Sequence, residues 1–254
     1  MKPMNTNLHK PQVTAHRGLA WDYPENTLIA FEAAIKLAPT YIELDYRTTV
    51  DGQLVCIHDD TLNRYLAGAH AQYVDIAIES LTYEQILEVD FGIWKHERFA
   101  GIHVATMEQV IDLFNQYAPT GTCPILMIEH KTGTVEQLLQ RLETFETTDQ
   151  YVVQSFHWDF LEKLHQLRPD IRLAALGDGQ MDHTQIRQAQ AMGCYAIHWD
   201  IQITPENITA ANNAGLEIWV STLNHPIMWL GATAIGLDAV TTDRCDKAIA
   251  FFQQ

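Results

Sequence analysis

Short runs of apolar residues alternate with longer amphipathic segments along most of the chain. The runs have the length of buried parallel strands, and the segments between them carry apolar residues at helical spacing. Eight strand–helix units within 254 residues favour a closed barrel over an open doubly wound sheet. We therefore predict an α/β fold in one domain over residues 1–254, a TIM (β/α)8 barrel. The predicted strands are residues 13–15, 41–44, 125–128, 151–153, 172–176, 195–197, 217–220 and 239–240.

Residues that favour helix ends mark several of the segments between the strands. Thr106, Thr134 and Thr204 each precede a helical pattern and are good N-caps. Pro24-Glu25-Asn26-Thr27 has the composition of a first helical turn, so we expect Pro24 to start the helix before the second strand. The predicted helices are residues 25–37, 107–117, 135–145, 158–167, 185–192 and 205–213.

One further strand, residues 53–57, does not fit the count of eight. Asp51-Gly52 lies between it and the second barrel strand and is a strong hairpin signal. A turn centred there places Asp45 roughly opposite His58, in an antiparallel ribbon at the barrel mouth. Residues 59–105 then form a long insertion, and an insertion of this length in a compact barrel usually covers a site. We expect it to be a small subdomain.

Composition narrows the classes of partner. Lys and Arg total 16 against 32 Asp and Glu, which gives a formal net charge of −16. This charge argues against a nucleic-acid or anionic-membrane surface, because both require basic patches. It is compatible with a small anionic substrate, since a bound metal ion and a few placed cations reverse the field locally.

The cysteines and the apolar runs indicate the cellular compartment in which we expect the protein. The four cysteines lie far apart and show no zinc-binding spacing, so we expect neither a disulfide framework nor a structural zinc ion. The N-terminal residues lack the apolar stretch of a signal peptide, and no run of about 18 apolar residues occurs. We therefore expect a cytoplasmic protein without stable membrane association.

Two carboxylates at the end of the second strand are the sharpest chemical signal. Glu43 and Asp45 stand at i and i+2, so both side chains point to the same side of the strand. Carboxylates this close repel each other unless a cation or a shared proton holds them, and oxygen ligands suit Mg²⁺, Ca²⁺ or Mn²⁺. Glu129 and Lys131 repeat the spacing on the third parallel strand. The pattern predicts a divalent-metal site, with Lys131 able to bind an anionic oxygen.

Two histidines are expected beside these carboxylates. His16 ends the first strand, where polar groups lie at the functional face of a barrel, and His58 comes from the ribbon. An imidazole titrates near neutral pH, so the pair can supply a base and an acid. Of the other histidines, His198 at the end of a strand is a second candidate, and His130 is expected to point away from Glu129.

Taken in order, several motifs resemble those of glycerophosphodiester phosphodiesterases. The most specific are Ala15-His16-Arg17-Gly18, Pro24-Glu25-Asn26-Thr27, Glu43-x-Asp45, Thr49-x-Asp51-Gly52 and His58-Asp59. Weaker matches are Glu129-x-Lys131, Ser155-Phe156, Trp219 with Asn224, and Thr242-Asp243. The resemblance covers nearly the whole chain and implies a TIM barrel with a small inserted subdomain.

The resemblance also implies an activity, namely hydrolysis of glycerophosphodiesters such as glycerophosphocholine and glycerophosphoethanolamine to sn-glycerol 3-phosphate and an alcohol. It implies a divalent metal ion, Mg²⁺ or Ca²⁺ with Mn²⁺ as a further option, held by the residues that match Glu43, Asp45 and Glu129. His16 and His58 match the catalytic histidines, and we favour His16 as base and His58 as acid. The residues assigned to substrate binding are Arg17 and Lys131, which match phosphate-contacting positions, with Phe156 and with Trp219, expected at the barrel mouth.

The chain departs from the pattern of the family in two places. His103-Val104-Ala105-Thr106 replaces an Ile-Pro-Thr-Leu-like run before a helix, which affects only how the insertion rejoins the barrel. His130 stands where an aliphatic residue is usual, and its expected direction keeps it away from the metal ligands.

Two other functions remain as alternatives. A lysophospholipase D-like or sphingomyelinase D-like phosphodiesterase would need an apolar acyl channel or a membrane-seeking loop, and residues 66–71 of the insertion are only mildly apolar. A non-catalytic barrel that only binds phosphodiesters would not need the two histidines and three carboxylates to be present together.

Overall fold

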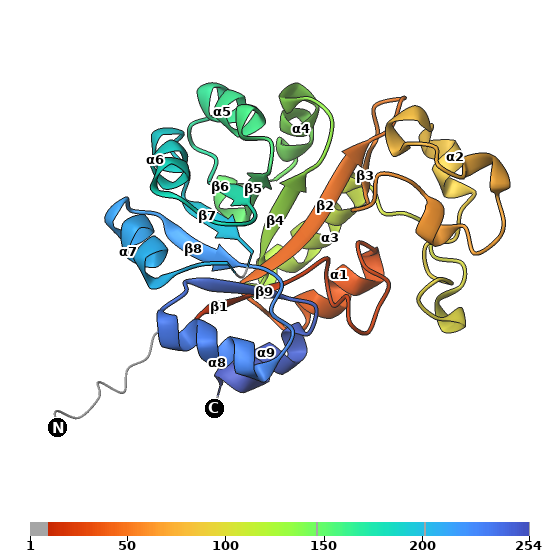
Figure 1. Ribbon diagram of the computed structural model, residues 1–254. Helices are drawn as coiled ribbons and strands as arrows, with labels where there is room; N and C mark the ends of the chain where they lie inside the picture. Colours follow the sequence, from red (N-terminus) through yellow and green to blue (C-terminus); the bar gives the residue numbers. More distant parts are fainter. Residues whose placement is uncertain (1–9, 146, 201, 254) are drawn as a thin grey trace.

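The structure, a computed structural model, describes residues 10–145, 147–200 and 202–253. Within these residues, eight parallel strands close into a ring (Figure 1). The ring consists of β1 (Gln12–Ala15), β2 (Tyr41–Thr48), β4 (Ile125–His130), β5 (Tyr151–Ser155), β6 (Leu173–Gly177), β7 (Ala196–Trp199), β8 (Glu217–Val220) and β9 (Ala239–Thr242). Strand β1 pairs with both β2 and β9, which closes the barrel. The predicted TIM barrel is therefore confirmed.

Helices follow the barrel strands and cover the outside of the ring, except α2, which lies in the insertion to one side of it (Figure 1). They are α1 (Leu28–Ile35), α2 (Tyr83–Leu87), α3 (Met107–Tyr117), α4 (Val135–Leu142), α5 (Trp158–Leu167), α6 (His183–Ala191), α7 (Pro205–Asn213), α8 (Pro226–Ile235) and α9 (Cys245–Phe252). The side chains of Thr106, Thr134 and Thr204 accept backbone hydrogen bonds at the starts of α3, α4 and α7, as predicted. None of the helices within the described residues combines the length and apolar character needed to cross a bilayer.

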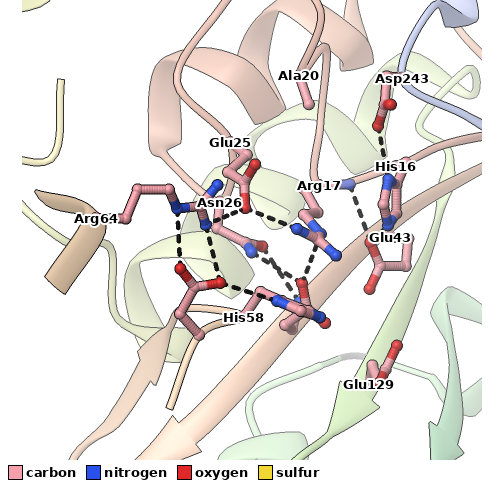
Figure 2. Close-up of polar contacts among 12 residues, drawn as sticks. His16, Arg17, Ala20, Glu25, Asn26, Glu43, His58, Arg64, Glu129 and Asp243 are labelled. Carbon is pink, nitrogen blue, oxygen red and sulfur yellow. Dashed lines mark hydrogen bonds and ion pairs between the residues drawn. The ribbon is translucent and has the colours of Figure 1, made fainter. Parts of the chain in front are cut away.

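Helix α1 begins later than the sequence predicts. Its N-cap is Thr27 and not Pro24, and its first residue is Leu28. Asn26 has a φ of 55°, in the left-handed region, so the chain turns before the helix begins. The side chains of Glu25 and Asn26 therefore point toward the C-terminal ends of the barrel strands, where Figure 2 shows them beside Arg17.

Strand β3 (Leu54–Cys56) pairs with β2 in an antiparallel ribbon outside the ring. The register differs by one residue from the prediction, because the backbone N–H of Ile57 donates to the carbonyl of Asp45, which therefore lies opposite Ile57 and not His58. The turn has three central residues, 50–52, and Gly52 takes the left-handed φ of 83° that this turn needs. His58 follows directly after the ribbon.

The segment 59–105 lies to one side of the barrel, next to β3 and α3 (gold in Figure 1). It contains α2 and several single-turn 3₁₀ helices. Tyr65, Ile86 and Phe91 belong to a hydrophobic cluster that is separate from the barrel core and includes Val55 and Ile57 of the ribbon region. The insertion is thus packed onto the ribbon that leads to His58.

Apolar side chains fill the barrel interior near the N-terminal ends of the strands, and Trp219 is the largest of them. Its indole N–H donates to Glu217 Oε2 at 2.8 Å, and its ring lies 5.1 Å from that of Tyr41. The expectation that Trp219 faces the barrel mouth is wrong, because the side chain runs toward the strand ends at which Tyr41 and Glu217 lie.

Candidate active site

Polar side chains line a cavity of about 180 Å³ at the C-terminal ends of the barrel strands. Barrel enzymes place their reacting groups at this end, where the loops after the strands meet. His16 directly follows β1, while Glu43 and Glu129 lie within β2 and β4. The lining residues are His16, Arg17, Glu43, His58, Glu129, Lys131, Gln154, Phe156, Leu176, His198, Ser221, Thr222 and Thr241.

Three carboxylates meet beside this cavity, as the spacing of Glu43 and Asp45 predicts. Asp45 and Glu129 are register partners on β2 and β4, and Glu43 projects from the same side of β2 as Asp45. One oxygen of each carboxylate lies within 4.8 Å of the other two. All three side chains are buried, and Oε1 of Glu43 has no hydrogen-bond partner among the described residues. Buried and unpaired oxygens at this spacing fit a divalent cation, which prefers such ligands.

Burial and mutual repulsion set the protonation of this cluster. Burial raises the pKa of Glu43 well above its usual value, and the charge of Asp45 raises it further. The same two causes raise the pKa of Glu129 to about 7. Burial also acts to raise the pKa of Asp45, but the positive charges of Arg17 and Lys131 outweigh it, so this pKa is lowered. A bound divalent cation would favour the charged form of all three carboxylates.

Two cations lie against the carboxylates and line the same cavity. Lys131 Nζ is 3.1 Å from Asp45 Oδ1 and also contacts Glu129. Arg17 Nε is 3.0 Å from Asp45 Oδ2, and the Arg17 backbone N–H donates to Glu43 at 2.9 Å. Both side chains are therefore placed where an anionic oxygen in the cavity would meet them.

The His16 ring is oriented by Asp243, which directly follows β9, the strand that pairs with β1 (Figure 2). Its Nδ1–H donates to Oδ1 of Asp243 at 2.6 Å, because a carboxylate only accepts, and Asn224 donates to the other oxygen of Asp243 at 2.7 Å. In neutral His16 the lone pair is then on Nε2, which lies 4.0 Å from Glu43 Oε2. His16 is thus oriented to accept a proton beside the acidic cluster.

His58 reaches the cavity from the end of the ribbon. Its Nδ1–H donates to Oδ1 of Asp59 at 3.0 Å. Arg64 of the insertion holds Asp59, with Nε 2.9 Å from Oδ2, and the same guanidinium donates to Glu25 at 2.7 Å. Burial lowers the pKa of His58 despite the nearby negative charge of Asp45.

Residues 16–247, a range that includes every residue of this cavity, match the family model described as the glycerophosphoryl diester phosphodiesterase family. The chain belongs to this family. A glycerophosphodiester phosphodiesterase of Bacillus altitudinis is 30% identical over 249 residues, which cover 94% of this chain and 96% of that protein. Another, of Caldanaerobacter subterraneus subsp. tengcongensis, is 29% identical over 92% of this chain and 94% of that protein. The solved structure of an Oleispira antarctica phosphodiesterase in complex with the product sn-glycerol-3-phosphate is 24% identical, with a TM-score of 0.85 and coverage of 96% and 97% of the two chains.

Membership of the glycerophosphodiester phosphodiesterase family confirms the resemblance drawn from the motifs around His16, Glu43 and His58. The protein is therefore an enzyme of a family that hydrolyses glycerophosphodiesters, which are small molecules. This conclusion removes the alternative of a barrel that only binds phosphodiesters.

Two residues of the phosphodiesterase site lie in Pro24-Glu25-Asn26-Thr27, a motif that the sequence links to this family but for whose residues it predicts no role besides helix initiation. Oε1 of Glu25 accepts hydrogen bonds from Arg17 and Arg64, each at 2.7 Å, and Figure 2 shows Glu25 between the two guanidinium groups. Asn26 donates to Asp45 Oδ2 at 3.0 Å and accepts the Asp45 backbone N–H at 3.2 Å. The sequence signal for a further role was the presence of two large polar residues before Thr27, because Thr27 alone is enough to cap the helix.

The other predicted positions lie as follows. His130 points away from Glu129, as predicted, and stacks on Phe160 outside the barrel with the ring centroids 3.6 Å apart. Phe156 is half-exposed at the rim of the cavity, and Lys131 Nζ lies 5.9 Å from the centre of its ring. The histidine at position 130 therefore does not reach the phosphodiesterase cavity, whereas Phe156 does.

Proposed function

We propose that this phosphodiesterase hydrolyses diesters such as glycerophosphocholine and glycerophosphoethanolamine to sn-glycerol 3-phosphate and an alcohol, with one divalent metal ion. The observation that carries the proposal is the meeting of three buried carboxylates with two oriented histidines beside one cavity. The proposed product is the compound bound in the Oleispira antarctica structure. In this proposal residues 1–254 are one phosphodiesterase domain, with residues 59–105 as its subdomain.

Glu43, Asp45 and Glu129 are the proposed ligands of the metal ion, for which Mg²⁺, Ca²⁺ and Mn²⁺ all suit an oxygen-only site. When bound, the ion supplies Lewis-acid polarisation of the phosphoryl group. Arg17 offers a planar fork of donors to the phosphate oxygens, and Lys131 offers a point charge. The metal ion would also neutralise the carboxylates that Arg17 and Lys131 contact in the structure.

The two histidines are proposed to move the protons. His16 Nε2 takes the proton of the glycerol 2-hydroxyl as the oxygen of that hydroxyl bonds to phosphorus. His58 gives a proton to the departing alkoxide as its P–O bond breaks, which leaves a cyclic phosphate and a free alcohol. Water then opens the ring: His58 takes the proton of the water, and His16 returns its proton to the glycerol oxygen. Asp243 keeps Nδ1 of His16 protonated and stabilises the imidazolium.

We also propose that the enzyme acts in the cytoplasm on soluble substrates. The four cysteines, all within the described residues, are unpaired. Unpaired cysteines are usual in a reducing compartment. The net charge of −16 supports the further proposal that neither nucleic acid nor an anionic membrane is a partner.

Release of sn-glycerol 3-phosphate and choline from glycerophosphocholine, with and without EDTA, tests the proposal. We expect turnover that EDTA abolishes and that excess Mg²⁺ or Ca²⁺ restores. Turnover that is insensitive to EDTA would disprove the metal ion, and failure to cleave any glycerophosphodiester in the presence of all three metals would disprove the activity.

A further inference from the structure

The inner end of the cavity carries two neutral polar side chains that the proposed mechanism does not use. Gln154 on β5 and His198 on β7 both line the cavity, and they are 1% and 2% exposed. Nδ1 of His198 lies 2.8 Å from Oε1 of Gln154, and because an amide oxygen only accepts, Nδ1 carries the proton. Burial lowers the pKa of His198 to about 3. The ring is therefore neutral, and its Nε2 holds a lone pair.

The amide NH₂ of Gln154, with its two N–H donors, and the acceptor Nε2 of His198 remain available at this pair. His198 Nε2 lies 3.4 Å from Thr241 Oγ1, which is longer than the roughly 2.7–2.8 Å usual for a hydrogen bond that a hydroxyl donates, so this contact is weak. The amide NH₂ of Gln154 makes no hydrogen bond to the part of the chain that the structure describes. A hydroxyl group both donates and accepts, so one hydroxyl can donate to His198 Nε2 and accept an N–H of Gln154.

The barrel is closed beyond this pair. Trp219 is 0% exposed, and the centre of its ring lies 6.1 Å from that of His198 and 5.1 Å from that of Tyr41, in a buried cluster that also contains Met127 and Val152. A ligand group that binds Gln154 and His198 must therefore end there, because a longer chain would run into Trp219. Interiors packed in this way do not open for an acyl chain without cost.

We infer that Gln154 and His198 form a hydroxyl-binding subsite, which takes the terminal hydroxyl of the glycerol half of the substrate. This inference rests on the proposed function and adds an orientation to it, with the glycerol inward and the alcohol toward Phe156 at the rim. The subsite makes the enzyme selective for diesters whose glycerol is not acylated. Lysophospholipids, which carry an acyl chain on that hydroxyl, are excluded.

Two phosphocholine substrates test the subsite, since they differ only in the hydroxyl that it binds. Glycerophosphocholine has the terminal hydroxyl, whereas 2-hydroxypropyl phosphocholine lacks it and keeps the reacting 2-hydroxyl. For the wild-type enzyme we expect kcat/KM to be about 10²-fold lower on the analogue, because the buried pair is left unsatisfied. Gln154→Met and His198→Phe should lower kcat/KM on glycerophosphocholine and leave it nearly unchanged on the analogue, so that the preference falls to within about threefold.

The outcomes separate this inference from the proposed function. A wild-type enzyme that cleaves both substrates equally well overturns the subsite and leaves the proposed function standing, whereas cleavage of neither overturns both. Equal losses on the two substrates in both variants would mean that the pair is only structural. Gln188→Met, the same change on the exposed face of α6, is the control. If the variants do not fold, inhibition of the wild type decides: sn-glycerol 3-phosphate should inhibit at least tenfold more strongly than 2-hydroxypropyl phosphate, and equal inhibition overturns the subsite.

Discussion

A single carboxylate determines which nitrogen of His16 can act. Asp243 accepts the Nδ1–H of His16 at 2.6 Å, and Asn224 fixes the other oxygen of Asp243. Asp243→Asn keeps the size of the side chain, but its amide can donate to Nδ1 and so move the His16 proton to Nε2. We expect kcat on glycerophosphocholine to fall by about 10²–10⁴-fold, the scale on which a catalytic base is lost. Steady-state kinetics measure this change.

The control for this variant is Asp246→Asn. Asp246 is the second residue of α9 and pairs with Lys247. We expect this variant to keep the wild-type kcat, and both variants to keep the wild-type metal affinity in isothermal titration. A wild-type kcat in Asp243→Asn would mean that His16 is not the base.

The acidic cluster couples folding to protons and to the metal ion. Burial and the charge of Asp45 raise the pKa of Glu129 from its ordinary 4.5 to about 7 and also raise that of Glu43. An acid with a raised pKa in the folded chain adds stability while it is protonated, and this stability is lost as pH rises from 4.5 through about 7. A metal ion replaces the protons, so it should raise the melting temperature more at about pH 8 than at about pH 5.5. We expect the difference to be about 2–4 °C, which corresponds to about 1 kcal/mol for a chain of this size.

Two variants check the source of this pH dependence. Glu129→Gln removes one of the titrating groups, so metal binding should weaken, and the melting temperature without metal should depend less on pH. Glu136→Gln, on α4 and exposed beside Lys163, is the matched control and should behave as the wild type does. An equal metal-induced shift at the two pH values in the wild type would contradict the assignment of these carboxylates as ligands.

Among the elements, the insertion reaches the site through Arg64. Its guanidinium donates to Glu25 at 2.7 Å, approaches Asp59 Oδ2 to 2.9 Å and lies 4.7 Å from the centre of the Trp94 ring. Arg64→Met would release Asp59, the partner of His58, and weaken the hold on Glu25. Since small displacements of catalytic groups are costly, we expect kcat/KM to fall by about 10–100-fold with metal affinity unchanged.

Arg187→Met, on the exposed face of α6, is the control for loss of an arginine and should keep the wild-type kcat/KM. Arg64→Met combined with Glu25→Gln should lose less than the product of the two separate effects, because both changes break one contact. Wild-type kcat/KM in Arg64→Met would show that the insertion does not position the site.

At the same scale, the ribbon shows what local sequence decides and what it leaves open. The common direction of Glu43 and Asp45 follows from alternation along a strand, which is local and was predicted correctly. The register of the ribbon was not, because Asp51-Gly52 fits turns with two or three central residues equally well. The longer turn is held by Thr49, whose hydroxyl accepts the backbone N–H of Gln53 at 2.9 Å.

Contacts between elements that are distant in sequence depend on how the barrel closes. Asp243 meets His16 only because β9 lies beside β1, and no local pattern around either residue encodes that pairing. The depth of Trp219 depends on the tilt and stagger of the strands, and a bulky residue within a buried strand fits either end of the barrel. Eight strands were therefore predictable, whereas these two placements were not.

The whole molecule carries a net charge of −16 and nevertheless acts on phosphodiesters. A field of this sign repels anions at a distance, and salt screens it beyond roughly 8–10 Å. Attraction must therefore arise inside the cavity, from Arg17, Lys131 and the proposed metal ion. Arg17 and Lys131 both contact Asp45 in the structure. A metal ion bound to Asp45 would replace these contacts, so that both side chains could bind the phosphate.

The net charge of the substrate should then decide how salt affects the enzyme. Glycerophosphocholine is zwitterionic with no net charge, whereas glycerophosphoglycerol carries one negative charge and is repelled on approach. At saturating metal, raising the salt concentration from about 10 to about 150 mM should raise kcat/KM for glycerophosphoglycerol about two- to threefold and leave that for glycerophosphocholine almost unchanged. Initial rates at one metal concentration measure both substrates side by side, with metal saturation checked at each salt concentration. A fall in kcat/KM for both substrates would instead mean that attraction by the cations in the cavity outweighs repulsion by the whole molecule even during approach.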